Sequence, residues 1–277
     1  MTLRLSRRLA DAAAPLDDAA EAVQAAVKSL PQEVRDVLDG TWLGAPLHPA
    51  VTDVPLGAWT AATMLDAVGS EAADPALAIG IAGAVGAAAT GLNDWSHLRG
   101  EARRLGVVHA LLNTAALSLN VASLVYRLQE RRELGRKLSA LAYGGSVLAA
   151  HLGGQLSFGL GVRVNRTAWE QGSDEFEAVL DESELSGEEL KRVEVGGVPV
   201  VVARAGGRIC AIAATCSHLG GPLDEGERRG DSVICPWHAS QFDLCTGDVQ
   251  HGPAVFPQPR YESRVRDGKI ELRRAES

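Results

Sequence analysis

The sequence predicts a two-part protein, in which a transmembrane bundle of four α-helices precedes an all-β domain. Nearly all of the long apolar runs lie before residue 162. Acidic residues and alternating β-branched runs follow that point. The 277 residues are enough for two domains, and the composition, 46% hydrophobic with 4% aromatic, is rich in alanine and glycine.

Residues 1–46 are expected to form N-terminal cytoplasmic helices on the protein surface. From Leu16 to Asp39 the chain is rich in alanine and charge, and Pro31 opens a second short segment. The first residues, MTLRLSRRLADAAAP, contain arginines but no apolar stretch behind them. Neither a secretory nor a twin-arginine signal is therefore expected.

Apolar runs within residues 47–162 predict the transmembrane domain. The four runs are Val54–Val68, Ala76–Leu92, Val107–Tyr126 and Leu138 to about Val162. Their lengths are close to the roughly 20 residues that span the hydrocarbon of a bilayer as a helix. The sequence therefore predicts a multi-pass protein of the cell membrane, with the lipid bilayer as a partner.

A soluble four-helix bundle is the alternative to a membrane domain, because alanine and glycine are only weakly hydrophobic. Asp53, Asp66 and Asp94 would also be costly in lipid, but they lie at or near the ends of their runs, where water reaches. Glycines such as Gly80 would let helices, or a flat ligand, approach closely. We interpret them as sites of close helix packing.

Four histidines fall at the same end of the predicted bundle, because the direction of the helices alternates. They are His48, His97, His109 and His151. Ionisable residues inside spans are usually functional, and paired imidazoles in a bundle are natural axial ligands of a b-type haem. We expect His109 and His151 to be the first choice of haem ligands, with His48 next and His97 last.

Two other interpretations of these histidines stay open. His48 and His97 would then be interfacial side chains bonded to loop carbonyls, while His109 and His151 would satisfy buried polar groups such as Asn113. A quinone bound at the same end of the bundle is the third alternative.

Residues 163–175 are polar and predict a linker, and residues 176–277 predict an antiparallel β domain. Alternating or β-branched runs indicate strands at Phe176–Leu180, Lys191–Val195, Pro199–Ala203 and Arg208–Ala213. Paired glycines at 196–197 and 206–207 indicate the turns between them.

Two short metal-ligand pairs lie in this β domain, Cys216-x-His218 and Cys235-x-x-His238. Two thiolates and two imidazoles would suit a tetrahedral zinc ion. They would equally suit a two-iron, two-sulfide cluster, in which the thiolates bind one iron and the imidazoles the other. The residues around the pairs distinguish these alternatives.

The first pair is followed by LGGPL and the second by ASQFD, with Thr246 and Gly247 further on. This pattern closely resembles the Rieske ferredoxin family, and the resemblance covers about Phe176 to Arg274. It implies that two hairpin loops clamp a [2Fe-2S] cluster between them. The helical half, with HPAVTDVP and HLGGQLSFGLGV, resembles a family of four-helix bacterial membrane domains of uncharacterised function.

The resemblance also implies a subtype. Quinol-oxidising Rieske proteins carry two more cysteines that join the loops by a disulfide, and Gly221 and Trp237 stand at those positions. This implies the ferredoxin-type branch, without that disulfide. In the high-potential branch a serine and a tyrosine donate hydrogen bonds near the cluster; Ser240 stands at the serine position, whereas Phe242 replaces the tyrosine. We therefore expect a potential in the lower part of the roughly −150 to +300 mV Rieske range.

The two remaining cysteines, Cys210 and Cys245, are expected to be reduced, because an intracellular setting keeps thiols reduced. His251 is expected in a surface loop. Basic residues are almost equally frequent at the two ends of the bundle, so they do not orient it. Three expectations together favour a cytoplasmic Rieske domain: no secretory or twin-arginine signal, unpaired cysteines and a ferredoxin-type cluster.

The sequence thus predicts a membrane-anchored electron carrier. Its cluster would exchange single electrons with a soluble donor or acceptor, such as a ferredoxin reductase or an oxidoreductase, and with a haem b or quinone in the bundle. A ferredoxin merely tethered by its membrane domain is the alternative, and redox sensing is a third class. The oligomeric state is left open, a homo-oligomer included.

Two function classes are not expected. A Rieske oxygenase would need a second domain with its own iron site, and only 39 residues follow His238. Binding of nucleic acid is not expected either, because the net charge is −8 and the sequence contains no basic stripe.

Overall fold

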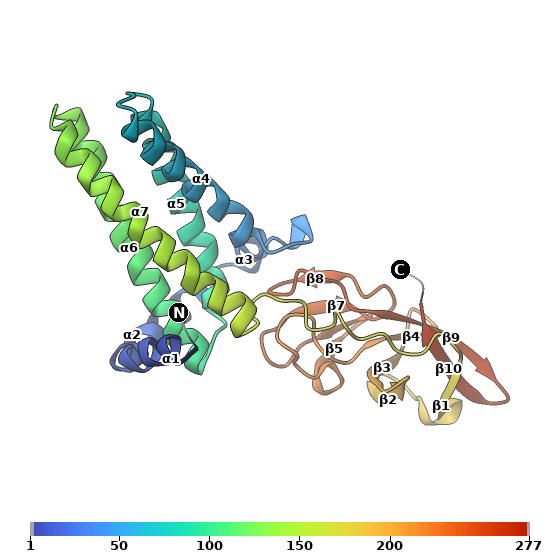
Figure 1. The fold of residues 1–277 in the computed structure, drawn as a ribbon. Helices are drawn as coiled ribbons and strands as arrows, with labels where there is room; N and C mark the ends of the chain where they lie inside the picture. The colour runs from blue at the N-terminus through green and yellow to red at the C-terminus, as the bar shows by residue number, and fades with distance from the viewer. Residues whose placement is uncertain (1–2, 276–277) are drawn as a thin grey trace. The chain divides into compact units, whose positions relative to one another are not determined.

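The structure, a computed structural model, describes residues 3–275 and divides the chain into two compact units (Figure 1). The first unit contains the residues up to Pro31 together with Pro46–Val162. The second unit contains Gln32–Ala45 and the chain from Arg163 onward. The chain is therefore helical in its first part and all-β in its last part, as the sequence predicts.

Six helices make up most of the first unit. Two short ones come first, α1 (Leu3–Ala12) and α2 (Asp17–Lys28). The long ones are α4 (Leu47–Ala67), α5 (Ala73–Trp95), α6 (Gly100–Leu128) and α7 (Arg132–Gly154), which continues as one π-helical turn, Gln155–Gly159. The short connections let α4 pack along α5 and α6 along α7.

Within the described part of the chain, α5 and α6 are the two helices that are long and apolar enough to cross a membrane. Their most apolar windows have a mean hydropathy of 1.6 and 1.5. α4 carries Asp53 and Asp66, and α7 begins with a charged turn, Arg132 to Lys137. The prediction of spans therefore agrees with two helices and stays a prediction for α4 and α7.

Close helix packing is the role of the glycines in α5. A Cβ atom on Gly80 would lie 2.2 Å from the indole nitrogen of Trp59, and one on Gly91 would lie 2.6 Å from the ring of His48. Only a residue without a side chain lets α4 approach α5 this closely. The interpretation of Gly80 as a packing site is confirmed.

The charges of the first unit form a network where α4 and α6 end. Arg127 has no exposed side-chain surface and binds Asp66 through two bonds of 2.5 and 2.8 Å. It also contacts Asp74 at 3.0 Å, and Arg136 adds a second cation beside Asp66 at 3.4 Å. These cations offset the free-energy cost of burying the Asp66 carboxylate.

The second unit is built from two antiparallel sheets. The larger has the strand order β1-β10-β9-β4-β3-β2 and the smaller the order β5-β6-β7-β8. The strands are β1 (Glu177–Asp181), β2 (Lys191–Val195), β3 (Val198–Ala205), β4 (Arg208–Ala213), β5 (Glu227–Arg229), β6 (Ser232–Ile234), β7 (Gln241–Asp243), β8 (Val249–His251), β9 (Arg260–Arg266) and β10 (Lys269–Arg274). All four strands expected from the sequence are present.

The core between the sheets reaches the predicted ligands. Cys210, Ile212 and Ala214 point to one face, because side chains alternate along β4. They pack with Val233 of β6 and Phe242 of β7, and the two cysteines of the ligand pairs belong to the same buried cluster. The core therefore supports the metal-ligand loops directly.

Residues 32–45 belong to the second unit, which corrects the sequence-based division that grouped them with residues 1–31. The helix α3 (Gln32–Asp39) lies on the loop that follows β8: Asp36 accepts hydrogen bonds from the His251 ring and the Gly252 amide, both at 2.8 Å. These partners lie more than two hundred residues away in the sequence, so local patterning did not indicate them. His251 is exposed, but it is paired with α3.

Candidate metal centre

The two loops that carry the predicted ligands have the same backbone construction. In the first loop, the Cys216 amide donates to the carbonyl of Gly221, and the Gly220 amide donates back to the Cys216 carbonyl, both at 2.8 Å. In the second loop, the Cys235 amide donates to Ser240 at 2.8 Å, and Ala239 donates to the Cys235 carbonyl at 3.0 Å. Each loop therefore wraps around its cysteine.

The repeated construction extends to the backbone angles. Gly220 has φ = 82° and Ala239 has φ = 63°, so the residue four places after each cysteine is left-handed. Glycine adopts this conformation without strain, whereas alanine does so at a cost. A non-glycine residue held in this region beside a candidate site is typical of a loop shaped by its function.

The structure groups the four predicted ligands into two pairs, the two thiols in one and the two imidazoles in the other. The thiols of Cys216 and Cys235 contact each other and are 1% and 2% exposed. The rings of His218 and His238 meet edge to face, with their centroids 5.2 Å apart. His218 is buried and His238 half-buried, so the thiols face the core while the imidazoles lie nearer the surface.

The pKa values of the two thiols shift in opposite directions. A hydrogen bond from the Cys216 thiol lowers the pKa of Cys235 from 9.0 to about 7, and the same bond holds the pKa of Cys216 well above 9.0. Burial adds to the rise at Cys216. One thiolate is thus available near neutral pH to bind a metal ion, since the thiolate is the form that binds.

This donor set fits a Rieske [2Fe-2S] cluster, with Cys216 and Cys235 able to hold one iron and His218 and His238 the other. The fit rests on the separation of sulfur from nitrogen donors, which the mixed ligation of such a cluster requires. The two thiols and the two imidazoles come from the two loops built around Cys216 and Cys235.

Three neighbouring residues shape the cage. A Cβ atom on Gly221 would lie 2.8 Å from the Cys235 sulfur and 3.1 Å from the Trp237 ring, so the two positions expected to face each other across the loops do so. Trp237 is 53% exposed, and its ring lies edge to face with His238. Ser240 is fully buried, and its hydroxyl oxygen accepts a 3.0 Å hydrogen bond from the Ala254 amide.

The expectation of two reduced cysteines is wrong, because Cys210 and Cys245 form a disulfide. The loops themselves are not cross-linked, since Gly221 and Trp237 occupy those positions. The bond instead joins β4 to the turn between β7 and β8, with Cα atoms 4.7 Å apart. The two cysteines are separated by 35 positions in the sequence, so no local pattern indicates their contact. The contact forms where β4 of the larger sheet meets the turn after β7 of the smaller sheet.

The histidines of the helical unit hold helices together in pairs. The Nδ1 atom of His48 lies 2.9 Å from the Ala87 carbonyl of α5, and that of His109 lies 2.8 Å from the Ala149 carbonyl of α7. The other ring nitrogen of His109 lies 3.1 Å from the Asn113 amide, so both of its nitrogens are engaged. This arrangement matches the alternative in which His109 satisfies a buried polar group.

The structure does not bring His109 and His151 together. His151 is exposed and lies two residues beyond Ala149, about 200° around α7 from the carbonyl that meets His109. His97 is buried at the turn after α5. The residues therefore do not fit the predicted pair of axial haem ligands.

Comparison with known proteins identifies the second unit. The family model of the Rieske [2Fe-2S] domain matches residues 175–262. Ferredoxin CarAc of Metapseudomonas resinovorans is 35% identical over 82 residues, which are 29% of this chain and 77% of the ferredoxin. The chain belongs to the Rieske [2Fe-2S] family.

Other Rieske proteins show similar matches. The ferredoxin component of biphenyl 2,3-dioxygenase from Rhodococcus jostii (strain RHA1) is 34% identical over 28% of this chain and 74% of its own length. The cytochrome b6-f complex iron-sulfur subunit of Chlorobaculum tepidum is also 34% identical, over 26% of this chain and 38% of the subunit. Among solved structures, the ferredoxin of carbazole 1,9a-dioxygenase from Nocardioides aromaticivorans IC177 has 29% identity, covering 35% of this chain and 96% of its own, with a TM-score of 0.34.

The helical unit matches a different family. A model described as predicted membrane protein (DUF2231) covers residues 44–166. The chain thus joins a Rieske domain to a domain of a membrane-protein family, and its Rieske relatives include electron-transfer ferredoxins and an iron-sulfur subunit.

Proposed function

We propose that this protein is a membrane-anchored electron carrier, whose Rieske domain exchanges single electrons with a soluble oxidoreductase. The observation that carries this proposal is the grouping of the four candidate ligands, in which two buried thiols lie beside two neighbouring imidazoles, the buried His218 and the half-buried His238. When bound, the cluster supplies one-electron redox chemistry. The chain would supply the ligands, bury the sulfur side and leave His238 partly exposed to a partner.

The docking surface in this proposal is the exposed ring of Trp237 beside His238. Trp237 is 53% exposed although it is large and apolar. Its ring centroid lies 6.4 Å from that of the ligand His238. Aromatic side chains of this kind are enriched at protein interfaces, so Trp237 would bring a partner close to the iron that the imidazoles hold.

The membrane role is also part of the proposal. We infer that α4–α7 form a four-helix, multi-pass bundle that keeps the Rieske domain at the cytoplasmic face. The apolar helices α5 and α6 and the match to a membrane-protein family support the membrane location. The cytoplasmic side rests on the resemblance to ferredoxin-type Rieske proteins, since the cysteines expected to be unpaired form a disulfide. Two long, closely packed helix pairs, α4 with α5 and α6 with α7, agree with a bundle.

A haem b or a quinone in the bundle stays a prediction, and the geometry does not favour haem. Both ring nitrogens of His109 have partners, and His151 lies on another side of α7. The function that the residues support best is therefore a tethered Rieske ferredoxin serving a separate enzyme, with the helical unit as its anchor.

Electron exchange with a flavin-dependent ferredoxin reductase tests the docking surface. The full-length protein in detergent is mixed with the reductase and its reduced nicotinamide donor, and reduction of the cluster is followed by absorbance. We expect Trp237→Ala to slow the reduction at least fivefold. Trp169→Ala is the matched control, because Trp169 is 77% exposed in the same unit but lies outside the ligand loops. Equal rates for both variants would contradict the docking surface.

Expression with ample haem tests the anchor role. The purified protein is predicted to show the Rieske paramagnetic signal on reduction and no optical band of a b-type haem. A stoichiometric haem band that disappears in His109→Ala would contradict a bundle that serves only as an anchor.

A further inference from the structure

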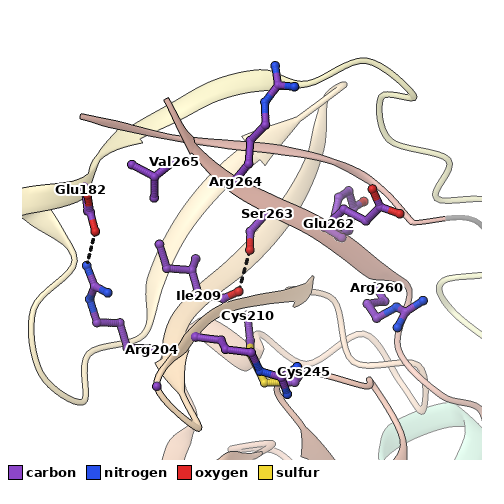
Figure 2. A pocket seen from close by; sticks show the side chains of 13 residues that line it. Glu182, Arg204, Ile209, Cys210, Cys245, Arg260, Glu262, Ser263, Arg264 and Val265 are labelled. Carbon is purple, nitrogen blue, oxygen red and sulfur yellow. Dashed lines mark hydrogen bonds and ion pairs between the residues drawn. A yellow bond between two sulfur atoms is a disulfide. The ribbon is translucent and has the colours of Figure 1, made fainter. Parts of the chain in front are cut away.

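A cavity of about 580 Å³ opens in the Rieske unit on the wall that holds the disulfide. It forms because β4 and β9 pair only at Ala211–Tyr261 and Ile212–Arg260 and then separate. The Ser263 hydroxyl bridges the gap, donating to the Ile209 carbonyl at 2.6 Å (Figure 2). The volume is typical of a site for a small molecule.

Arg208, Cys210 and Arg260 share one face of the larger sheet. Arg260 is the register partner of Ile212, and side chains at alternate positions of β4 lie on the same face as Ile212. Cys245 reaches this face from the turn after β7 and completes the disulfide. Figure 2 shows the disulfide among the side chains that line the cavity, which also include Arg260. Both arginines and both cysteines therefore line the same cavity.

Most charges on the cavity wall are neutralised by partners. The ion pairs are Arg204 with Glu182, Arg264 with Glu271, and Glu262 with Arg273. Within residues 3–275, neither Arg208 nor Arg260 forms an ion pair or a side-chain hydrogen bond. The cavity thus keeps two uncompensated positive charges in a chain whose net charge is −8.

The disulfide is accessible from this cavity. Cys245 is half-buried, whereas Cys210 is 6% exposed, so Cys245 is the more exposed residue of the pair. A cationic surrounding attracts an anionic reagent and stabilises a thiolate that leaves the bond. An anion that carries a thiol could therefore both bind to the arginines and react with the wall.

We propose that this cavity is a binding site for anionic low-molecular-weight thiols, which Arg208 and Arg260 hold against the Cys210–Cys245 disulfide for thiol–disulfide exchange. The small thiolate attacks the Cys245 sulfur, the bond to Cys210 breaks, and Cys210 leaves as a thiolate that takes a proton from water. A second small thiol attacks the mixed disulfide and releases Cys245 as a thiol. Two small thiols are thereby oxidised to their disulfide, and the protein disulfide is reduced to two thiols.

Rates of reduction by two thiols test the proposal. The full-length, cluster-loaded protein is treated with glutathione, which is anionic, or with 2-mercaptoethanol, which is neutral, at equal thiolate concentration. Loss of the disulfide is followed by alkylation and mass spectrometry. We expect R208Q/R260Q to lower the glutathione rate about fivefold to tenfold, because the variant removes both cations that would attract the anionic thiol. The 2-mercaptoethanol rate should change less than twofold.

The matched control is Arg229→Gln, which removes an exposed arginine of the same unit far from the cavity wall in sequence. It should leave both rates unchanged. A mixed disulfide between glutathione and Cys245, trapped by acid, would support the assignment of the attacked sulfur. The proposal is overturned if R208Q/R260Q slows both thiols equally or neither.

Discussion

Asp39 and Arg163 form a buried ion pair at 3.2 Å, although the helices α4–α7 separate them in the sequence. Their side chains are 1% and 7% exposed. Arg163 also donates to the carbonyl of Pro253 at 2.6 Å, in the loop that Asp36 holds from its other side. The segments that lead into and out of the helical unit thus fasten one loop of the Rieske domain, next to the Ala254 amide that binds Ser240.

The Asp39 carboxyl gives this contact a pH dependence. Burial raises its pKa from 3.8 to about 6, against the opposing pull of Arg163. A carboxyl whose pKa is higher in the folded protein takes up a proton on folding, so the free energy of unfolding falls as pH rises through 4 to 6. Relative to Asp39→Asn, the wild type should lose about 2 kcal/mol between pH 4 and pH 7.

Urea titrations of the two proteins across this pH range measure the difference, in which the other titrating groups cancel. Asp267→Asn serves as the control, because its side chain is 92% exposed, and its difference from the wild type should stay flat. A constant difference for Asp39→Asn as well would show that Asp39 does not titrate in this window.

Gly221→Ala should disturb the cluster cage. The added Cβ atom would meet the Cys235 sulfur at 2.8 Å and the Trp237 ring at 3.1 Å, so one ligand loop must shift. Overpacking of this kind costs about 1–3 kcal/mol. We expect less iron and sulfide per chain, measured by chemical analysis, whereas Gly144→Ala, with no atom within 4 Å of its added Cβ, should keep the wild-type content. Full cluster content in Gly221→Ala would refute the close contact of the loops.

Ser240→Ala should affect both stability and potential. It leaves the buried Ala254 amide without its acceptor, at a cost of about 1–3 kcal/mol. Loss of a hydroxyl donor beside the cluster should also lower the reduction potential, because fewer hydrogen bonds then stabilise the reduced state. Redox titration checks the sign, with Ser173→Ala in an exposed turn as the control. A higher potential in Ser240→Ala would contradict the role of this hydroxyl.

Arg127→Met should destabilise the helical unit by about 3–5 kcal/mol, because Asp66 and Asp74 would lose their buried partner. Thermal unfolding in detergent measures the loss. Asp66→Asn in the Arg127→Met background should restore part of it. Lys137→Met, at an exposed pair with Glu133, is the control and should change stability by less than about 0.5 kcal/mol. Similar losses in both methionine variants would argue against the network.

The two loops that carry the predicted ligands could be recognised from the sequence because their backbone geometry is local. Each loop is closed by hydrogen bonds between Cys216 and Gly221 or between Cys235 and Ser240, so the spacing of the residues carries the shape. The Cys210–Cys245 bond arises instead where β4 meets the turn after β7. No local pattern shows that contact.

For the histidines of the helical unit, too, the sequence does not indicate which residues meet across the helices. Alternating helix directions correctly placed His48 and His109 near the ends of their partner helices. The rotation of α7 decides which residue meets α6, and it presents Ala149 rather than His151 to His109. Amphipathic patterning is weak in a helix that is apolar on most sides, so the facing residue could not be identified in advance.

Analysis of metal and sulfide in freshly purified full-length protein tests the Rieske assignment most directly. The account predicts iron and acid-labile sulfide in equal amounts, two of each per chain, with a paramagnetic signal of mixed cysteine and histidine ligation on reduction. Replacement of His218 or His238 by cysteine should change that signal toward the all-cysteine type. One zinc ion per chain with no acid-labile sulfide would contradict the account.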